Sequence, residues 1–267
     1  MVKIAVAGAM GRMGNRLAAL AKEYESIILT GAFEKKGHSD IGKDIGLLAG
    51  IGETRILLED SIEKAVDRAD VIIDFTHASS TLEHLRTASA KGKAMVIGTT
   101  GFTKEQVGEI GTLTKTIPCV MASNMSLGVN LLLKVLRDVA RVLGDDYDIE
   151  IIEAHHRMKK DAPSGTAMKM AQVIADAVNR DLDEVAVYAR KGMTGERTKK
   201  EIGIQTIRAG DIVGEHTVLF GGLGERIEIT HKASSRDTFA RGALRAAIWV
   251  SGKPAGLYDM QDVLGLK

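Results

Sequence analysis

The sequence predicts an α/β protein of two domains: an N-terminal doubly wound parallel sheet and a C-terminal α+β domain with a mixed or antiparallel sheet. Up to about residue 125, short and almost continuously apolar runs alternate with stretches of helical periodicity. This alternation is typical of parallel strands that are covered by helices on both faces. Beyond residue 125, two long helical patterns flank one strand, and three strands then follow in succession. We therefore expect one domain at 1–125 and another at 126–235, with 236–267 packing back on the first domain.

The first domain is expected to open on a strand and to alternate strand and helix from there. Strands are predicted over residues 2–7, 27–33, 71–75, 94–97 and 118–122. Helices are predicted over residues 11–22, 61–68, 80–91 and 103–116. The first helix places Leu17, Leu20 and Ala21 on one face, and Thr103 is a suitable N-cap for the last one. Each strand with its helix is one β-α unit of the predicted parallel sheet.

The second domain has a different order of elements. The predicted elements are helix 128–143, strand 147–154, helix 163–179, and strands 202–208, 215–220 and 226–231; helix 236–250 follows in the part expected to pack back on the first domain. Pro163 suits a first helical turn, because the N–H that proline lacks would have no helical partner there. The last three strands are joined by short links, "AGDIVG" and "GGLGE". Such links predict an antiparallel meander.

The overall composition argues against several classes of partner. The 267 residues include 36 basic and 35 acidic side chains, so the net charge of +1 does not favour nucleic acid or an anionic membrane. No apolar run reaches the roughly 18–20 residues that span a bilayer. The start of the chain lacks a signal-peptide pattern, and Cys119 is the single cysteine, so no intrachain disulfide can form. We expect a cytoplasmic protein in which Cys119 is a packing residue.

A glycine motif follows the first predicted strand. "VAGAMGRMG" places Gly8, Gly11 and Gly14 between that strand and the next helix, spaced G-x-x-G-x-x-G. Backbone without Cβ atoms can approach a pyrophosphate closely, and the helix start offers N–H groups and the positive end of its dipole. Arg12 and Met13 are placed to flank the phosphates. The motif predicts a Rossmann-type dinucleotide-binding domain; the alternative is a merely tight β-α turn.

The end of the second predicted strand bears on the choice of dinucleotide. Glu34 follows Gly14 by 20 residues, where a carboxylate would contact the adenine ribose. A carboxylate favours the free 2′-hydroxyl of NAD, whereas the neighbouring Lys35 and Lys36 favour the 2′-phosphate of NADP. The cofactor is therefore expected to be NADH, NADPH or both. A solvated basic loop is the alternative for the two lysines.

Two further strand ends carry small polar turns, "IGTTG" and "ASNMS". In an open parallel sheet, ligands bind beyond the carboxyl ends of the strands. The turns at 98–100 and 122–125 therefore suit the nicotinamide side of the cofactor, although purely structural turns would look the same. Asp74, Phe75 and Thr76 end another strand in the same manner.

The densest cluster of reactive groups is "EAHHRMKKDAPSGTA", residues 153–167. His155 and His156 end a predicted strand, where adjacent side chains point to opposite faces. A histidine can exchange protons near neutral pH, and a lysine near other cations is suited to donate one. Residues 164–166 begin a helix and form an anion cradle. The combination suits a small dicarboxylate substrate; a solvated basic turn is the alternative. A metal site is not expected, because no third ligand stands at a recognisable spacing.

Several of these motifs together resemble one known family. "AGAMGRMG", "IGTTGF", "SNMSLGVN", "EAHHRMKKDAPSGTA" and "EITHKASSR" occur in the order found in 4-hydroxy-tetrahydrodipicolinate reductases, also called dihydrodipicolinate reductases. The resemblance extends from residue 2 to about residue 266. It implies reduction of a cyclic unsaturated dicarboxylate by NADH or NADPH, with loss of water, in lysine and diaminopimelate synthesis. It also implies a homotetramer assembled through the sheet of the second domain.

The resemblance assigns roles residue by residue. It implies that His155 is the acid/base histidine, that Lys159 is the proton donor, and that His156, Ser164, Gly165 and Thr166 bind the substrate. The implied cofactor residues are Gly8, Ala9, Met10, Gly11, Arg12, Met13, Glu34, Lys35, Gly98, Thr99, Thr100, Ala122, Ser123, Asn124 and Met125. Lys35 stands where the family commonly has arginine, whose fork suits phosphate better, and this weakens a strict preference for NADPH.

Other functions remain open from the sequence. The chain could be another nicotinamide-dependent dehydrogenase of amino-acid metabolism, such as an aspartate or homoserine dehydrogenase, or a dinucleotide sensor without catalysis. Neither alternative accounts for the histidine and lysine of the cluster at 153–167. The basic loop at 190–200 is expected either to help cover the site or to be solvated.

Overall fold

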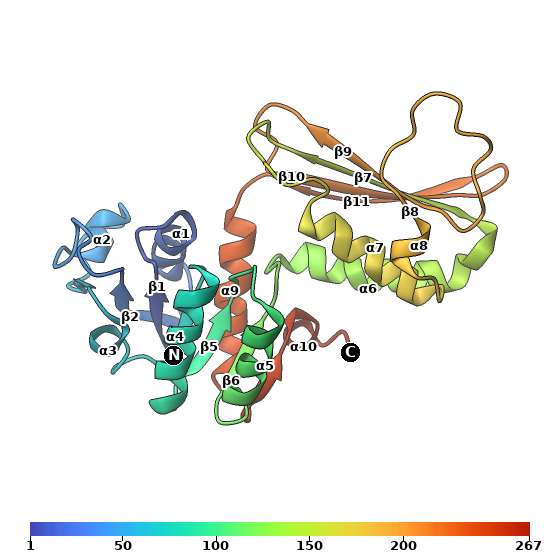
Figure 1. The fold of residues 1–267 in the computed structure, drawn as a ribbon. Helices are drawn as coiled ribbons and strands as arrows, with labels where there is room; N and C mark the ends of the chain where they lie inside the picture. The colour runs from blue at the N-terminus through green and yellow to red at the C-terminus, as the bar shows by residue number, and fades with distance from the viewer. The chain divides into compact units, whose positions relative to one another are not determined.

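The computed structural model describes residues 1–267 as two compact units (Figure 1). Unit 1 comprises Met1–Leu127 together with Asp237–Lys267, and unit 2 comprises Gly128–Arg236. The end of the chain is therefore part of the same unit as its beginning. None of the helices combines the length and apolar character needed to cross a bilayer.

Unit 1 is built on a seven-stranded sheet in which every pair of neighbours is parallel. The strands are, in spatial order, β12 (Gly256–Tyr258), β6 (Pro118–Met121), β5 (Ala94–Ile97), β4 (Val71–Asp74), β1 (Val2–Ala7), β2 (Ile27–Phe33) and β3 (Leu58–Glu59). The predicted doubly wound parallel sheet is confirmed. The order reverses at β1, which has β2 on one side and β4 on the other, and a crevice at the carboxyl ends of the strands is expected at such a point.

Helices cover both faces of this sheet. They are α1 (Arg12–Ala21), α2 (Ile45–Leu48), α3 (Ile62–Ala65), α4 (Ala78–Ala90), α5 (Lys104–Leu113), α9 (Asp237–Val250) and α10 (Met260–Leu264). Ile4 and Val6 of β1 belong to the apolar core with α1 and α9, whereas Ala5 and Ala7 belong to the core with α3, α4 and α5. Because alternate strand residues face opposite ways, β1 is buried on both sides. The short elements α2, β3, β12 and α10 were not predicted.

Unit 2 contains a mixed sheet, as predicted, and the sheet has five strands. Its strands are, in spatial order, β11 (Arg226–Ala233), β10 (Gly214–Gly221), β7 (Asp148–His155), β9 (Ile202–Arg208) and β8 (Ala186–Val187). Its helices are α6 (Leu127–Leu143), α7 (Gly165–Ala177) and α8 (Leu182–Val185), with a 3-10 turn at Gly144–Asp146. Side chains of α6 and α7 pack with the buried face of this sheet into one apolar core. Elements α8 and β8 were not predicted.

The predicted antiparallel meander is wrong for its first strand. β10 and β11 form an antiparallel pair, but β9 pairs with β7 in parallel, and β7 lies between β9 and β10. The central place buries Ile149 and Ile151 of β7 almost completely. A meander of β9, β10 and β11 would leave β7 outside these three strands, with at most one of them as its neighbour, and its apolar side chains would be less buried. Burial of β7 therefore favours the observed order of strands, although the link between β9 and β10 is short enough for a hairpin.

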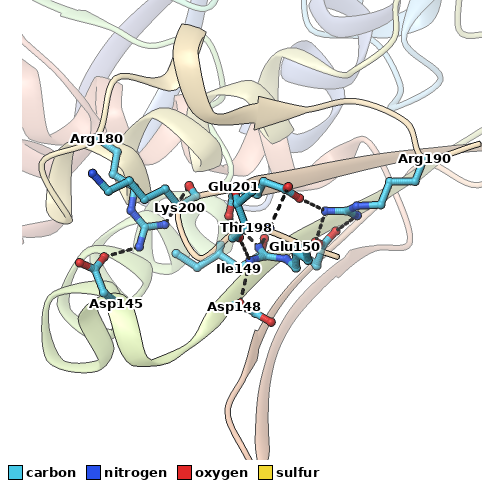
Figure 2. A network of polar contacts seen from close by, with 10 residues as sticks. Asp145, Asp148, Ile149, Glu150, Arg180, Arg190, Thr198, Lys200 and Glu201 are labelled. Carbon is cyan, nitrogen blue, oxygen red and sulfur yellow. Dashed lines mark hydrogen bonds and ion pairs between the residues drawn. The ribbon is translucent and has the colours of Figure 1, made fainter. Parts of the chain in front are cut away.

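The basic loop between β8 and β9 is anchored at both ends by ion pairs (Figure 2). Arg190 contacts Glu150 at 2.8 Å and Glu201 at 2.9 Å. Arg197 contacts Asp148 at 2.7 Å and donates to the carbonyl of Ile149. The network ties the loop to the first half of β7 and the start of β9.

Candidate active site

Four loops of unit 1 meet at one edge of its parallel sheet. β1, β4, β5 and β6 end in register, since Ala7 pairs with Asp74, Asp74 with Ile97, and Ile97 with Met121. The glycine loop, Thr76 and the turns at 98–100 and 122–125 follow these strands directly. The structure therefore brings the predicted cofactor segments together at the carboxyl edge of one sheet.

The glycine loop has a geometry that only glycine permits at two positions. Gly8 has φ of +59°, and a Cβ on it would lie 2.7 Å from Cγ2 of Thr76. A Cβ on Gly14 would lie 2.1 Å from the carbonyl oxygen of Gly8. The amide of Gly11 donates to that same oxygen at 2.9 Å. The start of α1 thus folds tightly over the loop, and the backbone is left open to a ligand.

Glu34 lies beside the glycine loop at the end of β2. Its carboxylate accepts the N–H of Met10 at 3.1 Å and the N–H of Lys35 at 3.1 Å. A cavity of about 710 Å³ opens here, and the predicted cofactor residues that line it are Gly8, Gly11, Arg12, Glu34 and Lys35. Ala9, Met10 and Met13 do not line it. The volume and the glycine backbone fit the phosphate and ribose part of a dinucleotide.

Thr76 and His84 line another part of this cavity, and both are held in place by Asp74, a fully buried carboxylate. It accepts the hydroxyl of Thr76 at 2.7 Å and that of Thr81 at 3.0 Å, and its second oxygen lies 2.6 Å from Nδ1 of His84. Burial acts to raise the pKa of Asp74, but the bonds from His84 and Thr76 hold that pKa below its usual value. Thr99 also directs its hydroxyl inward, to Asp74 at 3.3 Å. The side chain of Thr99 therefore belongs to the buried hydrogen-bond network around Asp74, beneath the carboxyl edge of the sheet.

The turns on the predicted nicotinamide side are held by close packing. A Cβ on Gly98 would lie 2.1 Å from the ring of Phe75, and the amide of Ala122 donates to the carbonyl of Ile97. Asn124 Oδ1 accepts the N–H of Ser126, and Met125 is buried. The predicted nicotinamide-side residues lie outside the lining of the 710 Å³ cavity, namely Gly98, Thr99, Thr100, Ala122, Ser123, Asn124 and Met125.

In unit 2 the predicted acid/base residues lie at the end of β7. His155 is its last residue, so His156 lies beyond the strand and its direction does not follow from strand alternation, contrary to the sequence argument. The ammonium of Lys159 lies 2.9 Å from Asp161, and its side chain is mostly buried. That contact holds the pKa of Asp161 below its usual value. His155 is also mostly buried, and burial lowers its pKa, which favours the neutral imidazole.

The predicted anion cradle is the start of α7, which begins two residues later than expected. The helix begins at Gly165 with Ser164 as its N-cap, so Pro163 precedes the helix. Ser164 Oγ accepts the N–H of Ala167 at 3.2 Å and lies 3.1 Å from Nε2 of His216. Ser164 is almost fully buried, and its hydroxyl is used within the protein. Gly165 and Thr166 occupy the first turn, where backbone N–H groups and the helix dipole attract anions.

Comparison with known proteins identifies the family. The family model described as dihydrodipicolinate reductase, N-terminus, matches residues 2–125, and the model described as dihydrodipicolinate reductase, C-terminus, matches residues 128–264. The chain belongs to the dihydrodipicolinate reductase family. The resemblance found in the sequence motifs is thereby confirmed.

Full-length relatives and a solved structure agree with this. The chain is 59% identical over 267 residues to the 4-hydroxy-tetrahydrodipicolinate reductase of Syntrophobacter fumaroxidans and 56% identical to that of Geotalea daltonii, covering 100% of both chains in each case. It is similar to a dipicolinate-bound dihydrodipicolinate reductase from Paenisporosarcina sp. TG-14, with a TM-score of 0.76, 26% identity and 98% of each chain covered. Dihydrodipicolinate reductases are oxidoreductases that use NADH or NADPH, which fits the glycine loop of unit 1.

Three polar residues of unit 2 were missed as parts of the site: Glu153, Arg208 and His216. Glu153 lies 2.6 Å from Nδ1 of His155, and Arg208 contacts Glu153 at 2.8 Å. The ring of His216 packs edge-on against His155, with centroids 5.2 Å apart. Only Glu153 left a signal in the sequence, since a charged residue two positions before His155 faces the same side of an apolar strand.

Burial of His216 predicts a loss of stability in mild acid. Burial, with smaller contributions from His155, His231 and Lys159 and against an opposing one from Glu153, lowers the pKa of His216 from 6.5 to about 4. Between these values the unfolded chain binds a proton that the native state does not, so the free energy of unfolding falls as pH falls. Urea denaturation at pH 7 and pH 4.5 should show the loss smaller by roughly 1–3 kcal/mol in His216→Asn than in the unaltered chain. Equal losses would show that His216 does not titrate in this way.

Proposed function

We propose that this chain catalyses the NAD(P)H-dependent reduction of 4-hydroxy-tetrahydrodipicolinate to tetrahydrodipicolinate, with loss of water, in lysine and diaminopimelate synthesis. The observation that carries the proposal is the match of both units to one reductase family, at 59% identity over the full length to an enzyme of that name. The two sites described above supply the parts that this chemistry needs.

The proposal assigns unit 1 to the cofactor, which supplies the hydride when bound. Gly8, Gly11 and Gly14 fit the group, because a Cβ on Gly14 would collide with the loop itself and one on Gly8 would collide with Thr76. Glu34 and Lys35 are assigned to the ribose end at the lined cavity. The turns at 98–100 and 122–125 are assigned to the nicotinamide end, at the carboxyl ends of β5 and β6.

Unit 2 is assigned to the substrate and to proton transfer. Gly165 and Thr166 bind a substrate carboxylate at the start of α7, with His156 as a further contact and Ser164 holding the helix start as its cap. His155 exchanges a proton through its imidazole, and Lys159 donates one to the reduced substrate. Loss of water removes the hydroxyl together with a proton from the neighbouring ring carbon, and the conjugated ring that forms accepts the hydride; the proton from Lys159 then adds to the reduced ring.

Assembly and location complete the proposal. One face of the unit 2 sheet packs on α6 and α7, and the other carries partly exposed side chains such as Ile152, Leu219 and Ile207. We place the contacts of a homotetramer on that second face, because a sheet face with apolar side chains favours pairing with another copy. The single buried Cys119 accords with action in the reducing cytoplasm.

The proposal is tested by mixing the purified protein with NADPH and substrate generated enzymatically in the cuvette. We expect the absorbance of reduced nicotinamide to fall only when substrate is supplied. If NADPH binds but the absorbance stays flat over a range of enzyme concentrations, the chain is a dinucleotide-binding protein without this activity.

The two nicotinamide cofactors should both support turnover. Glu34 favours the free ribose hydroxyl, whereas the exposed Lys35 attracts a 2′-phosphate as a point charge rather than as a fork. We expect kcat/KM for NADH and NADPH to lie within about tenfold, which corresponds to about 1.4 kcal/mol. Lys35→Ala should lower kcat/KM for NADPH alone, with Lys36→Ala as the neighbouring control. A hundredfold preference in the unaltered chain would show that one of the two groups dominates.

A further inference from the structure

Glu153 is a fully buried carboxylate at the centre of the polar cluster of unit 2, and none of the roles assigned above uses it. It stands two residues before His155 in β7, so both side chains lie on the same face of the sheet. The register places Thr206 of β9 and His216 of β10 on either side of it. A buried charge of this kind is costly unless it is paired and hydrogen-bonded.

Its two oxygens are fully engaged by donors from four residues in three segments. Oε1 accepts the N–H of Ser164 at 3.0 Å, the hydroxyl of Thr206 at 3.2 Å and Nη2 of Arg208 at 2.9 Å. Oε2 accepts Nη1 of Arg208 at 2.8 Å and lies 2.6 Å from Nδ1 of His155. The arginine therefore contacts both oxygens and orients the plane of the carboxylate.

This arrangement determines which nitrogen of His155 carries the proton. Burial acts to raise the pKa of Glu153, but the bonds from Arg208 and His155 hold that pKa below its usual value, so the carboxylate is ionised. An ionised carboxylate only accepts hydrogen bonds, and Nδ1 of His155 must then be the donor. Nε2 of the neutral ring consequently keeps its lone pair.

The surroundings of Nε2 leave room on that side of the ring. A Cβ placed on Gly214, the first residue of β10, would lie 3.2 Å from Nε2. Glycine thus keeps the first position of β10 clear of the imidazole. The ring of His216, edge-on at 5.2 Å between centroids, holds another side of His155.

The same carboxylate also holds the start of α7. The amide of Ser164, the N-cap residue, donates to Glu153, and its hydroxyl caps the helix by accepting the N–H of Ala167. The first turn of α7 is where the substrate carboxylate is assigned. One side chain therefore connects the proton-exchanging histidine with the anion cradle.

We propose that Glu153 is the positioning residue of this site: it fixes His155 as the tautomer with a free Nε2 and sets that nitrogen at a defined place relative to the first turn of α7. Glu153 acts through His155 and Ser164 and does not itself touch the substrate. The inference rests on the proposed function, in which His155 exchanges a proton during reduction.

A purely structural ion pair is the competing explanation, and β7 offers a matched control for it. Glu150 is a second carboxylate of the same strand, clamped by Arg190 and Arg197 (Figure 2). Three positions from Glu153, it lies on the opposite face of the sheet, and its carboxylate crosses β9 over Gly203, where a Cβ would collide with it. Glu150→Gln removes a comparable ion-pair network without altering His155.

The pH dependence of kcat separates a positioning role from structural damage, because damage alone would not shift the pKa of His155. The charged or titratable groups that face His155 are Glu153, Arg208, His216 and Lys159; Glu153 raises the pKa of His155, whereas Arg208 and Lys159 lower it. Glu153→Gln should lower kcat about 10- to 100-fold and move the histidine limb of the profile to lower pH, with KM for NADPH nearly unchanged. Arg208→Gln should move the limb to higher pH. Glu150→Gln should leave the limb where it is.

The tautomer itself is read by ¹⁵N NMR of the full chain labelled at histidine, with His155→Asn used for assignment. We expect protonated Nδ1 and unprotonated Nε2 in the unaltered chain and in Glu150→Gln, and loss of this pattern in Glu153→Gln. Because a single change can leave a buried charge unpaired, the double variant Glu153→Gln/Arg208→Gln removes both charges. It should fold, lose the tautomer pattern and keep the low kcat.

Each result bears on the inference separately from the proposed function. A proton on Nε2 in the unaltered chain, or kcat and a pH profile of Glu153→Gln equal to those of Glu150→Gln, would overturn the role of Glu153 while leaving the reductase activity standing. Absence of any turnover in the unaltered chain would overturn the proposed function instead. The NMR experiment would then still decide the tautomer of His155.

Discussion

Replacing Lys159 by alanine should lower kcat by about 10²- to 10⁴-fold, the range expected for loss of a general acid. Lys159 lies in unit 2, whereas the glycine loop and Glu34 belong to unit 1. The dissociation constant of NADPH, measured by nicotinamide fluorescence, should therefore change by less than about threefold, far below the change in kcat. His155→Ala should show the same separation of the two quantities.

Lys160 supplies the matched control for this experiment. It is the next residue, carries the same charge and is exposed, and no role is assigned to it. Lys160→Ala should keep kcat within about threefold, since a solvated lysine adds only to the local potential. Equal losses in the two variants would mean that the local positive charge matters, and not a proton donated by Lys159. A parallel loss of NADPH binding in Lys159→Ala would contradict its assignment to the substrate side.

Gly14→Ala is expected to disrupt cofactor binding and to destabilise unit 1. The added Cβ would lie 2.1 Å from the carbonyl oxygen of Gly8 and 2.7 Å from Cα of Ala9, so the loop and the start of α1 must separate. Overpacking of this kind costs about 1–3 kcal/mol. Because the same loop is assigned to the phosphates, KM for NADPH should rise by about tenfold or more, which corresponds to at least about 1.4 kcal/mol.

Gly108→Ala is the control for the glycine substitution. Gly108 lies in α5, is exposed, and has nothing within 4 Å of the position that a Cβ would take. Alanine there should stabilise the protein by about 0.5–1 kcal/mol through helix propensity, with KM unaltered. Thermal melts and initial rates measure both effects. A Gly14→Ala protein with normal KM would show that the loop does not approach the cofactor.

The fold of unit 1 was largely accessible from the sequence, because its strands are buried on both faces. β1 and β2 have the predicted bounds, and so does β5, since each apolar run stops abruptly at a glycine or a polar residue. The predicted N-cap Thr103 is observed as well, with a complete capping box. What the pattern could not reveal is the edge strand β12, whose three residues carry no periodicity.

Unit 2 shows where local patterns are insufficient. The link between β9 and β10 is short enough for a hairpin, yet β7 inserts between them, because pairing partners depend on burial of the whole strand. Ser164 looked like a ligand in the sequence, but its hydroxyl caps α7 and contacts His216, which is 52 residues away. Neither outcome follows from nearest neighbours along the chain.

The site residues that are close together in the sequence could be predicted, whereas those joined only by the fold could not. The glycine loop with Glu34 and the histidine–lysine cluster were each visible as compact motifs, because their residues are close in sequence. The bond between Glu153 and Arg208 joins residues 55 positions apart, so only the sheet register reveals it. Arg208 has no distinguishing neighbour in the sequence, and its role emerges only when β9 is placed beside β7.

Direct transfer of hydride to the dicarboxylate is the central claim, and isotope transfer tests it most directly. The full chain would be incubated with NADPH carrying deuterium at both C4 positions of the nicotinamide, together with enzymatically generated 4-hydroxy-tetrahydrodipicolinate. Mass spectrometry of the product should show tetrahydrodipicolinate bearing deuterium, formed in step with oxidised cofactor. Product without deuterium, or oxidised cofactor without product, would contradict the account.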